Sequence, residues 1–532
     1  MEPRLTKQFL ITYMNYTKET AEQLYTKLEG ARHSYLDRGR QAARLTLPYI
    51  LPEEGFGTSS RLNTPFQSIG SKGTNNLASK LLLALLPPNA PFFRLQVDKN
   101  KLQQEGAEEA ALSEIDSALQ KIEDTIMESI AEERIRIVLH EALKNLIVTG
   151  NALIFTDEKL GMRVFRLDRF VIERDPMGNV LYIATKETIS YSALDDEIKE
   201  IIGTPKDLSK TTDVNNVNLY TAICRHDDKW MLKQDINGTL LPKTGGLIPL
   251  DKNPYIPLRF SRVDGESYGR SFIEDMLGDL QSLESLTQAI VEGSAAAAKV
   301  LFLVSPNGTT KARDLSKSPN GAIVSGSAND VSTLQLNKFN DFRVAAETIN
   351  SIKDRLGQSF LLTSNSIRNA ERVTAEEIRM VSQELESSLG GLYSLLSNEL
   401  QTPLVNRIME VMQKTKKMPK LPSNLVKPVV ITGLEALGRG NDLQKLDAFL
   451  AGAAQVVGPQ AVGAFVNVDE YFKRRATSLG IKTAGLIKTQ EEILQEQQQA
   501  QMQQMAEKLG PSAIKSATDQ AMASEQPEEP IE

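Results

Sequence analysis

The amino-acid sequence predicts a mainly helical α+β protein built from several structural units. With 532 residues the chain is longer than a single compact domain usually is. Leucines and isoleucines spaced three and four apart in residues 108–130 predict an amphipathic helix, and similar patterns recur along the chain. Between residues 151 and 262 short strand patterns follow one another without helices between them, which is typical of an antiparallel sheet.

Composition limits the kind of protein this can be. Hydrophobic residues make up 41% and charged residues 24%, so the chain can bury a sizeable core. Cys224 is the only cysteine, which rules out an internal disulfide and fits an intracellular protein. The most apolar run, residues 81–86, is far shorter than the roughly 20 residues that cross a bilayer, so we expect no membrane partner. The net charge of −7 argues against tight DNA binding, though not against a passage through which DNA slides.

The strand-rich stretch carries clear turn signals. Residues 175–179, with the sequence DPMGN, combine the residue types that favour tight turns. We expect this turn to join a strand over residues 164–173 to a strand over residues 180–185. Further strands are predicted over residues 219–224, 230–234 and 256–260.

Two long helices with an insert between them follow the strands. Ser271 and Glu274 have the spacing of a capping box, which predicts a helix running to about Lys299. The insert contains turn signals and precedes a second helix over residues 342–362. The first helix ends in four small residues, Ala295, Ala296, Ala297 and Ala298. Small side chains let helix backbones approach closely, so we expect these alanines to pack against a neighbouring helix.

A third long helix is predicted over residues 374–412. Gly390, Gly391 and Pro403 fall inside it and predict a bend or a break. A smaller helical region is expected to follow as far as residue 486. The last residues form a Gln-rich helix and then a tail whose composition is typical of disorder.

One motif suggests an enzyme. Residues 265–269 read Gly-Glu-Ser-Tyr-Gly, and a strand before and a helix after them resemble the nucleophile elbow of a serine hydrolase. In that fold the histidine that activates the serine comes later in the chain. His33, His140 and His226 all precede Ser267. A structural turn that leads into a long helix is the better interpretation, and no catalytic residue is predicted.

Cofactor and metal motifs are equally weak. A single cysteine and three dispersed histidines do not make a Cys/His zinc site. Residues 433–440 have the glycines of a phosphate-binding loop but lack its lysine. We expect no cofactor, although the sequence leaves a carboxylate-only Mg²⁺ or Ca²⁺ site open.

The best candidate for a binding function is a polar segment between the second and third long helices. It contains Ser364, Asn365, Arg368 and Arg372, which suit a loop that contacts phosphate groups without reading bases. An ordinary helix–helix loop with solvated arginines is the simpler interpretation from this segment alone. A weaker basic cluster in the insert consists of Lys311, Arg313 and Lys317, for which surface solvation is the simpler explanation.

Four separated stretches carry a resemblance to a known family. They are residues 64–81, 264–274, 371–379 and 433–440. Together with the order of helices and strands, these stretches resemble the portal proteins, or head–tail connectors, of short-tailed podoviruses of the autographivirus type. The resemblance covers residues 17–490 and breaks down at both ends of the chain.

The resemblance implies a portal-type fold with named regions along the chain. These are an N-terminal arm (1–16), a wing (17–270), a first stem helix (271–299), a clip (300–340), a second stem helix (341–362), a tunnel loop (363–373), a long kinked wing helix (374–412), a crown (413–490), and a C-terminal helix and tail (491–532). By the same resemblance the tunnel-loop residues lie near DNA, the clip lysines and arginine dock partners, and the alanine run packs between subunits.

The resemblance also implies an assembly and its partners. Twelve copies would form a ring at one capsid vertex, assembled in the host cytoplasm and retained in the virion. Double-stranded DNA would pass through its channel. The other partners would be the capsid and scaffolding proteins, the terminase large subunit, the tail adaptor and internal core proteins. A non-viral intracellular scaffold is the main alternative, and a hydrolase that uses Ser267 is a weaker one.

Overall fold

The computed structural model describes most of the chain up to residue 455. The described residues are 19–55, 61–87, 92–97, 109–202, 216–241, 245–297, 301–319, 321–334, 339–362, 391–419, 426–430 and 447–455, with short pieces between 380 and 389 and single residues after 455. The chain forms two compact units, Met1–Glu435 and Ala436–Glu532. In the second unit the described helical stretch is 447–455, where Asp447 accepts a hydrogen bond from the hydroxyl of Tyr471 (2.7 Å).

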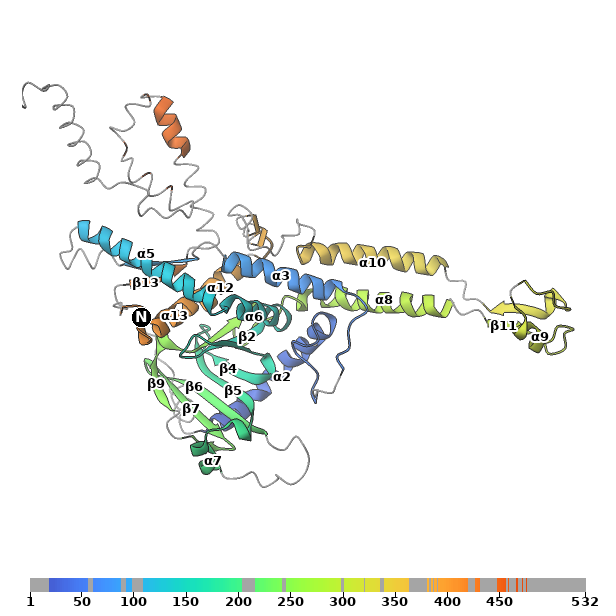
Figure 1. Ribbon diagram of the computed structural model, residues 1–532, viewed down its shortest axis with the longest axis horizontal. Helices are drawn as coiled ribbons and strands as arrows, with labels where there is room; N and C mark the ends of the chain where they lie inside the picture. Colours follow the sequence, from blue (N-terminus) through green and yellow to red (C-terminus); the bar gives the residue numbers. More distant parts are fainter. Residues whose placement is uncertain are drawn as a thin grey trace, which may run out of the picture. The chain divides into compact units, whose positions relative to one another are not determined.

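The predicted antiparallel sheet is formed by strands between residues 170 and 249 (Figure 1). Its strands in spatial order are β4 (Phe170–Arg174), β5 (Val180–Ser190), β6 (Asn216–His226), β7 (Lys229–Ile236) and β8 (Thr239–Leu240), and β9 (Gly246–Pro249) also pairs with β7. The short helix α7 (Asp196–Ile202) lies between β5 and β6 in the chain. The expected turn before β5 is confirmed, since the Asp175 carboxylate accepts from the Asn179 N–H (2.7 Å) and Gly178 has a φ of +90°.

The structure contains a second, smaller sheet, whereas the sequence predicted a single one. It contains β10 (Tyr255–Arg259), β2 (Asn151–Thr156) and β3 (Met162–Phe165), all antiparallel. The prediction of a single strand over residues 164–173 is therefore wrong. A 3₁₀ turn, Leu167–Arg169, ends β3 and starts β4 in the other sheet, and Leu167 is fully buried at that turn.

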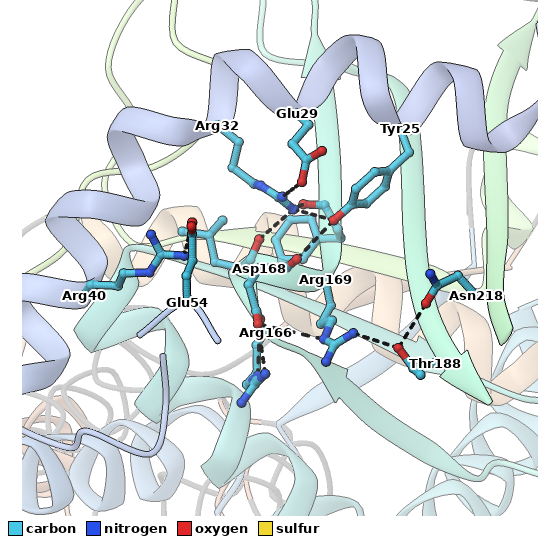
Figure 2. Close-up of polar contacts among 12 residues, drawn as sticks. Tyr25, Glu29, Arg32, Arg40, Glu54, Arg166, Asp168, Arg169, Thr188 and Asn218 are labelled. Atoms are coloured by element: carbon cyan, nitrogen blue, oxygen red, sulfur yellow. Dashed lines mark hydrogen bonds and ion pairs between the residues drawn. The ribbon is translucent and has the colours of Figure 1, made fainter. Parts of the chain in front are cut away.

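Helix α2 (Ala21–Leu45) fixes this turn with a buried arginine (Figure 2). Arg32 is 1% exposed and donates to the carbonyl oxygens of Leu167 (3.1 Å) and Phe170 (2.7 Å). It also donates to the Tyr25 hydroxyl (2.9 Å) and pairs with Glu29 (2.9 Å). A hydrogen-bonded and ion-paired arginine thus satisfies two backbone carbonyl groups at the turn between the two sheets.

Three more helices pack on one another, and one of them, α6, also packs on the small sheet. They are α3 (Ile69–Leu85), α5 (Glu109–Glu132) and α6 (Ile135–Thr149), and α6 contacts α2, α3, α5 and β2. The sequence also predicts a helix over residues 134–148 that stops at Gly150. This stop is confirmed, because Gly150 has a φ of +75° and its N–H bonds the Leu146 carbonyl (2.9 Å). The sequence did not predict a strand pair formed by β1 (Phe93–Val97) and β13 (Val426–Val430), and only β13 lies in the region that was expected to be helical crown.

The predicted stem is an antiparallel pair of helices, α8 (Leu277–Ala297) and α10 (Phe339–Ser359) (Figure 1). The capping box is confirmed, since Glu274 N–H donates to Ser271 Oγ (3.0 Å) and Ser271 N–H donates to Glu274 Oε1 (3.2 Å). A 3₁₀ turn, Glu274–Met276, precedes α8. The insert contains β11 (Leu301–Val304), α9 (Ala312–Lys317) and β12 (Val331–Leu334), and the two strands pair with each other.

The last part of the predicted kinked helix consists of α12 (Leu392–Leu396), a π-helical turn (Ser397–Gln401) and α13 (Thr402–Lys414). Pro403 follows the π turn after one residue, Thr402. Proline has no N–H and its ring clashes with the carbonyl four residues earlier, so the widened turn before it is the expected response. The break that Pro403 predicted is thus a local change of helix type.

Replacing Arg32 by methionine should destabilise the fold strongly. The change keeps the length of the side chain but leaves buried carbonyl oxygens without a donor, which costs about 3 kcal/mol. We expect a lower urea midpoint for the Arg32→Met protein, followed by tryptophan fluorescence. Arg44→Met is the matched control, because the Arg44 side chain is 62% exposed in its pair with Glu53. Equal midpoints for the two variants would contradict this account.

Candidate functional site

The predicted site residues fall into three groups with different outcomes. The tunnel-loop residues Ser364, Asn365, Arg368 and Arg372 lie outside the described residues. The clip residues Lys311, Arg313 and Lys317 lie at or within α9, and all three are exposed. In the alanine run, Ala295 and Ala296 are exposed near the end of α8, Ala297 is its last residue, and Ala298 lies outside the described residues.

The motif that suggested a hydrolase is a structural joint. Ser267 Oγ accepts a hydrogen bond from the Arg174 N–H (3.1 Å), and the hydroxyl of Tyr268 accepts from the Ile172 N–H (3.1 Å). Tyr268 is 2% exposed, and burial raises the pKa of its hydroxyl well above the usual range. Both side chains hold β4 in place. Ser267 Oγ thus accepts a hydrogen bond that helps to position β4.

The glycine that closes this motif allows three segments to meet. Asn151 and Gly269 exchange two hydrogen bonds, from Gly269 N–H to Asn151 Oδ1 (2.7 Å) and from Asn151 Nδ2 to the Gly269 carbonyl (2.9 Å). A Cβ added at Gly269 would lie 2.6 Å from the Gly150 carbonyl oxygen and 2.8 Å from the Cβ of Arg259. Only glycine fits there, so the end of α6, the small sheet and the start of the stem are tied together at this point.

A charged cluster joins the same loop to α2. Glu266 accepts from the Tyr35 hydroxyl (2.7 Å) and from Arg270 Nε (2.9 Å). Arg38 lies over the Tyr35 ring at 4.6 Å and pairs with Glu274 at 3.5 Å. The hydrogen bond from Arg270 lowers the pKa of Glu266, whereas burial, followed by the bond to Glu266, raises the pKa of Tyr35 to about 12. Near neutral pH Glu266 is therefore an anion and Tyr35 stays protonated, and the hydrogen bond between them fixes the base of the predicted stem on α2.

The C-terminal end of α10, the predicted second stem helix, packs on one face of α3. Asn76 Nδ2 donates to the carbonyl oxygens of Phe360 (3.0 Å) and Leu361 (3.1 Å). Lys80, 4% exposed, donates to the Leu361 carbonyl (3.0 Å) and pairs with Glu384 (2.8 Å). A single buried ammonium thus connects the end of the stem to the segment that follows the predicted tunnel loop.

Gly73, one turn before Asn76, makes room for the Phe360 ring, which would lie 2.3 Å from an added Cβ. Part of the stretch that resembled the portal family, residues 64–81, therefore has a structural role. Asn76 and Lys80 bind the end of α10, and Gly73 leaves space for it.

The π-helical turn is anchored to the small sheet by the carboxylate of Glu399, whose side chain is 13% exposed. Glu399 accepts from the Arg259 N–H (3.0 Å) and from Arg259 Nε (3.0 Å), and Arg174 Nη1 lies 3.8 Å away. Burial lowers the pKa of Arg174 to about 10, and Glu399 opposes that shift. Sequence reasoning missed this site, because no local pattern shows that residues 259 and 399 meet.

The insert is organised by one carboxylate as well. Asp330 accepts from the Thr310 N–H (3.0 Å) and from the Thr309 hydroxyl (3.0 Å). The backbone bond lowers the pKa of Asp330. These bonds tie the start of β12 to the residues just before α9, so the basic side chains of α9 are presented from an ordered loop.

Neither a metal site nor a membrane segment emerges from the described residues. Within them no cluster of three or more His, Cys, Asp or Glu side chains is placed to hold a metal ion. Nor does any described helix have the length and apolar character needed to span a bilayer.

Comparison with known proteins decides the family. The profile of a family described as "Bacteriophage head to tail connecting protein" matches residues 18–487. The chain belongs to this family. It is 39% identical to the portal protein of Escherichia phage T7 over 96% of this chain and 94% of the relative, and 38% identical to that of Enterobacteria phage T3 over 93% and 92%. The resemblance seen in the sequence is thus confirmed.

A relative in another phage and a solved structure are also similar. The portal protein of Pseudomonas phage phiKMV is 29% identical over 95% of this chain and 99% of its own length. A chain in the neck of an empty GTA particle, computed with C6 symmetry, covers 78% of this chain and 90% of its own length at 9% identity, with a TM-score of 0.35. The relatives are structural portal proteins and not enzymes, and neither the non-viral scaffold nor the serine hydrolase is supported.

The joint at Gly269 gives a direct test of the packing. Gly269→Ala should lower the thermal midpoint by several degrees, because the added methyl group would overlap the Gly150 carbonyl oxygen and separate the segments that meet there. Gly278→Ala in α8 is the matched control, since nothing lies within 4 Å of its added Cβ and alanine favours a helix by about 1 kcal/mol. A Gly269→Ala protein as stable as the Gly278→Ala protein would contradict the proposed packing.

Proposed function

We propose that copies of this chain assemble into the portal ring at one vertex of a phage capsid and connect head to tail. The observation that carries this proposal is the similarity to portal proteins over nearly the whole chain, 39% identity across 96% of its length. The ring is a dodecamer, it resides in the virion, and it assembles in the host cytoplasm with capsid and scaffolding proteins. Double-stranded DNA passes through its channel during packaging and ejection.

The charge of the first stem helix supports a channel wall. Residues 271–297 contain the carboxylates of Glu274, Asp275, Asp279, Glu284 and Glu292 and no lysine or arginine. Glu274 pairs with Arg38 and Asp279 with Arg355, so the helix carries little free negative charge. Because it also lacks a cation of its own, it offers DNA phosphates no ion pair and leaves DNA free to move. The wall faces a polyanion without gripping it, as a conduit requires.

The insert and the polar segment supply the contacts with partners. The exposed Lys311, Arg313 and Lys317 fit acidic surfaces of the terminase large subunit and, later, of the tail adaptor. Arg368 and Arg372 contact DNA phosphates from the tunnel loop, which follows the end of α10. Internal core proteins bind the crown, the part of the ring inside the capsid.

Negative-stain electron microscopy of the purified protein tests the assembly. We expect cylinders with a central hole wide enough for duplex DNA, and rotational averages with twelve-fold symmetry. A protein that stays monomeric at high concentration, or that forms solid particles without a hole, would refute the proposal.

Reversing both tunnel-loop arginines should impair DNA retention and spare the ring. In particles built with Arg368→Glu plus Arg372→Glu, carboxylates replace the groups that contact phosphate, so the DNA content per particle should fall. The measurement is the ratio of absorbance at 260 nm to that at 280 nm in purified particles. Lys159→Glu plus Lys229→Glu reverses two exposed wing charges as the control. Normal DNA content in the arginine variant would count against the assigned role.

A further inference from the structure

Each stem helix has an outward face that its own chain leaves uncovered. The inner faces pack together through Leu280 and Leu283 of α8 and through Ile349, Ile352 and Leu356 of α10, all of them buried. The two helices of one chain therefore cover each other on one side only. What remains is a pair of exposed helix surfaces that point away from each other.

These two outward faces carry polar residues at the same spacing. On α8 the row, called here the α8 row, is Gln281, Ser285, Gln288 and Glu292. On α10 the corresponding α10 row is Arg343, Glu347, Asn350 and Asp354. Both rows step by four, three and four residues, which keeps all members on one side of a helix with 3.6 residues per turn. Seven of the eight residues are exposed, and Gln288 is half-buried.

Two contacts within the chain fix how α8 and α10 are aligned along their length. The height of a residue is its position along this helix pair, from the base to the tip. Near the base, Arg355 donates to Asp279 (2.7 Å), and near the tip, a Cβ added at Gly293 would lie 2.8 Å from the Phe342 ring. In this antiparallel register Glu292 lies at the height of Arg343 and Gln281 at the height of Asp354. The two rows thus match in height residue by residue, although they point in opposite directions.

A closed ring needs this kind of match. Its interface is heterologous, so one surface of a subunit must complement a different surface of the next. Rotation about the ring axis leaves heights along that axis unchanged, so where the stem helices run along the axis, residues of equal height meet. We infer that the α8 row of one copy packs against the α10 row of the adjacent copy. This inference rests on the ring of the proposed function.

The chemistry of the matched positions is complementary. Glu292 meets Arg343 of the adjacent copy as an ion pair. Gln288 meets Glu347, and Gln281 meets Asp354, so in both pairs an amide N–H₂ faces a carboxylate that accepts hydrogen bonds. Ser285 meets Asn350, two groups that can each donate and accept. Within the described part of the chain, two members of the α8 row are joined by a hydrogen bond from Gln288 Nε2 to Glu292 Oε1 (2.8 Å).

Other charged groups of the stem are used elsewhere or point elsewhere. Glu284 accepts from the N–H groups of Phe66 (2.9 Å) and Gln67 (3.2 Å). Asp279 is occupied by Arg355 of its own chain. Lys353, exposed on α10, falls outside the α10 row by one residue and so lies on a different side of the helix. These groups leave the α8 and α10 rows as the matched surfaces.

A charge exchange tests the interface. Glu292→Arg alone and Arg343→Glu alone each place like charges together at every contact between copies. Each should raise the concentration for half-maximal ring formation about tenfold, measured by mass photometry. The combined variant restores opposite charges and should assemble like the original protein. Lys353→Glu is the control for a reversed charge outside the row and should leave assembly unchanged. Failure of the combined variant to recover, or no effect of the single changes, would overturn the inference.

A disulfide test gives an independent measurement. In Ser285→Cys plus Asn350→Cys the two thiols of one chain point apart, so oxidation can join only different copies. We expect covalent multimers on a non-reducing gel for the double variant and monomers for each single one, with buried Cys224 left in place. Rings without covalent multimers would overturn the inference alone. An original protein that forms no rings would instead overturn the proposed function.

Discussion

The reciprocal hydrogen bonds between Asn151 and Gly269 set the geometry on which the stem depends. They hold the loop before the stem against the first residues of β2, where the absence of a side chain on Gly269 lets three segments converge. The charged cluster of Tyr35, Glu266 and Arg270 adds a second attachment, to α2. A long helix that emerges from a fixed root has a defined direction, and a defined direction is what a ring of identical helices requires.

The second stem helix returns to a different anchor. Its end is received by α3, where Asn76 and Lys80 satisfy the last carbonyl oxygens and Gly73 accommodates the ring of Phe360. Because Lys80 also pairs with Glu384, the position of α10 is linked to the chain after the predicted tunnel loop. A similar ion pair joins Glu399 in the π turn to Arg259 of the small sheet. Buried ion pairs of this kind contribute defined geometry more than net stability.

The two stem helices therefore have separate roots and shared inner faces, and their outer faces are left for neighbours. This arrangement connects the fold to the family to which the chain belongs. Polar outer rows that match in height provide directional contacts, which specify one neighbour and one register.

Much of the architecture could be predicted from local pattern alone. The spacing of Ser271 and Glu274 predicted the capping box, the composition of residues 175–179 predicted the turn, and Gly150 predicted the end of α6. Four short stretches were enough to indicate the family. Local signals work here because caps and turns depend on residues only a few positions apart. The motif at Ser267 misled only in its chemistry, and the order of the histidines already corrected that.

Tertiary structure alone decided which distant residues meet. The division of residues 164–173 between two sheets follows from a buried arginine on α2, and the pairing of β1 with β13 joins segments more than three hundred residues apart. The anchors at Lys80 and Glu399 and the equal heights of the stem rows have no local signature either. Sequence by itself determined the helices, the turns and the family, because these are set by spacing along the chain. Only folding decided the joints and the matched surfaces, because those depend on distances in space.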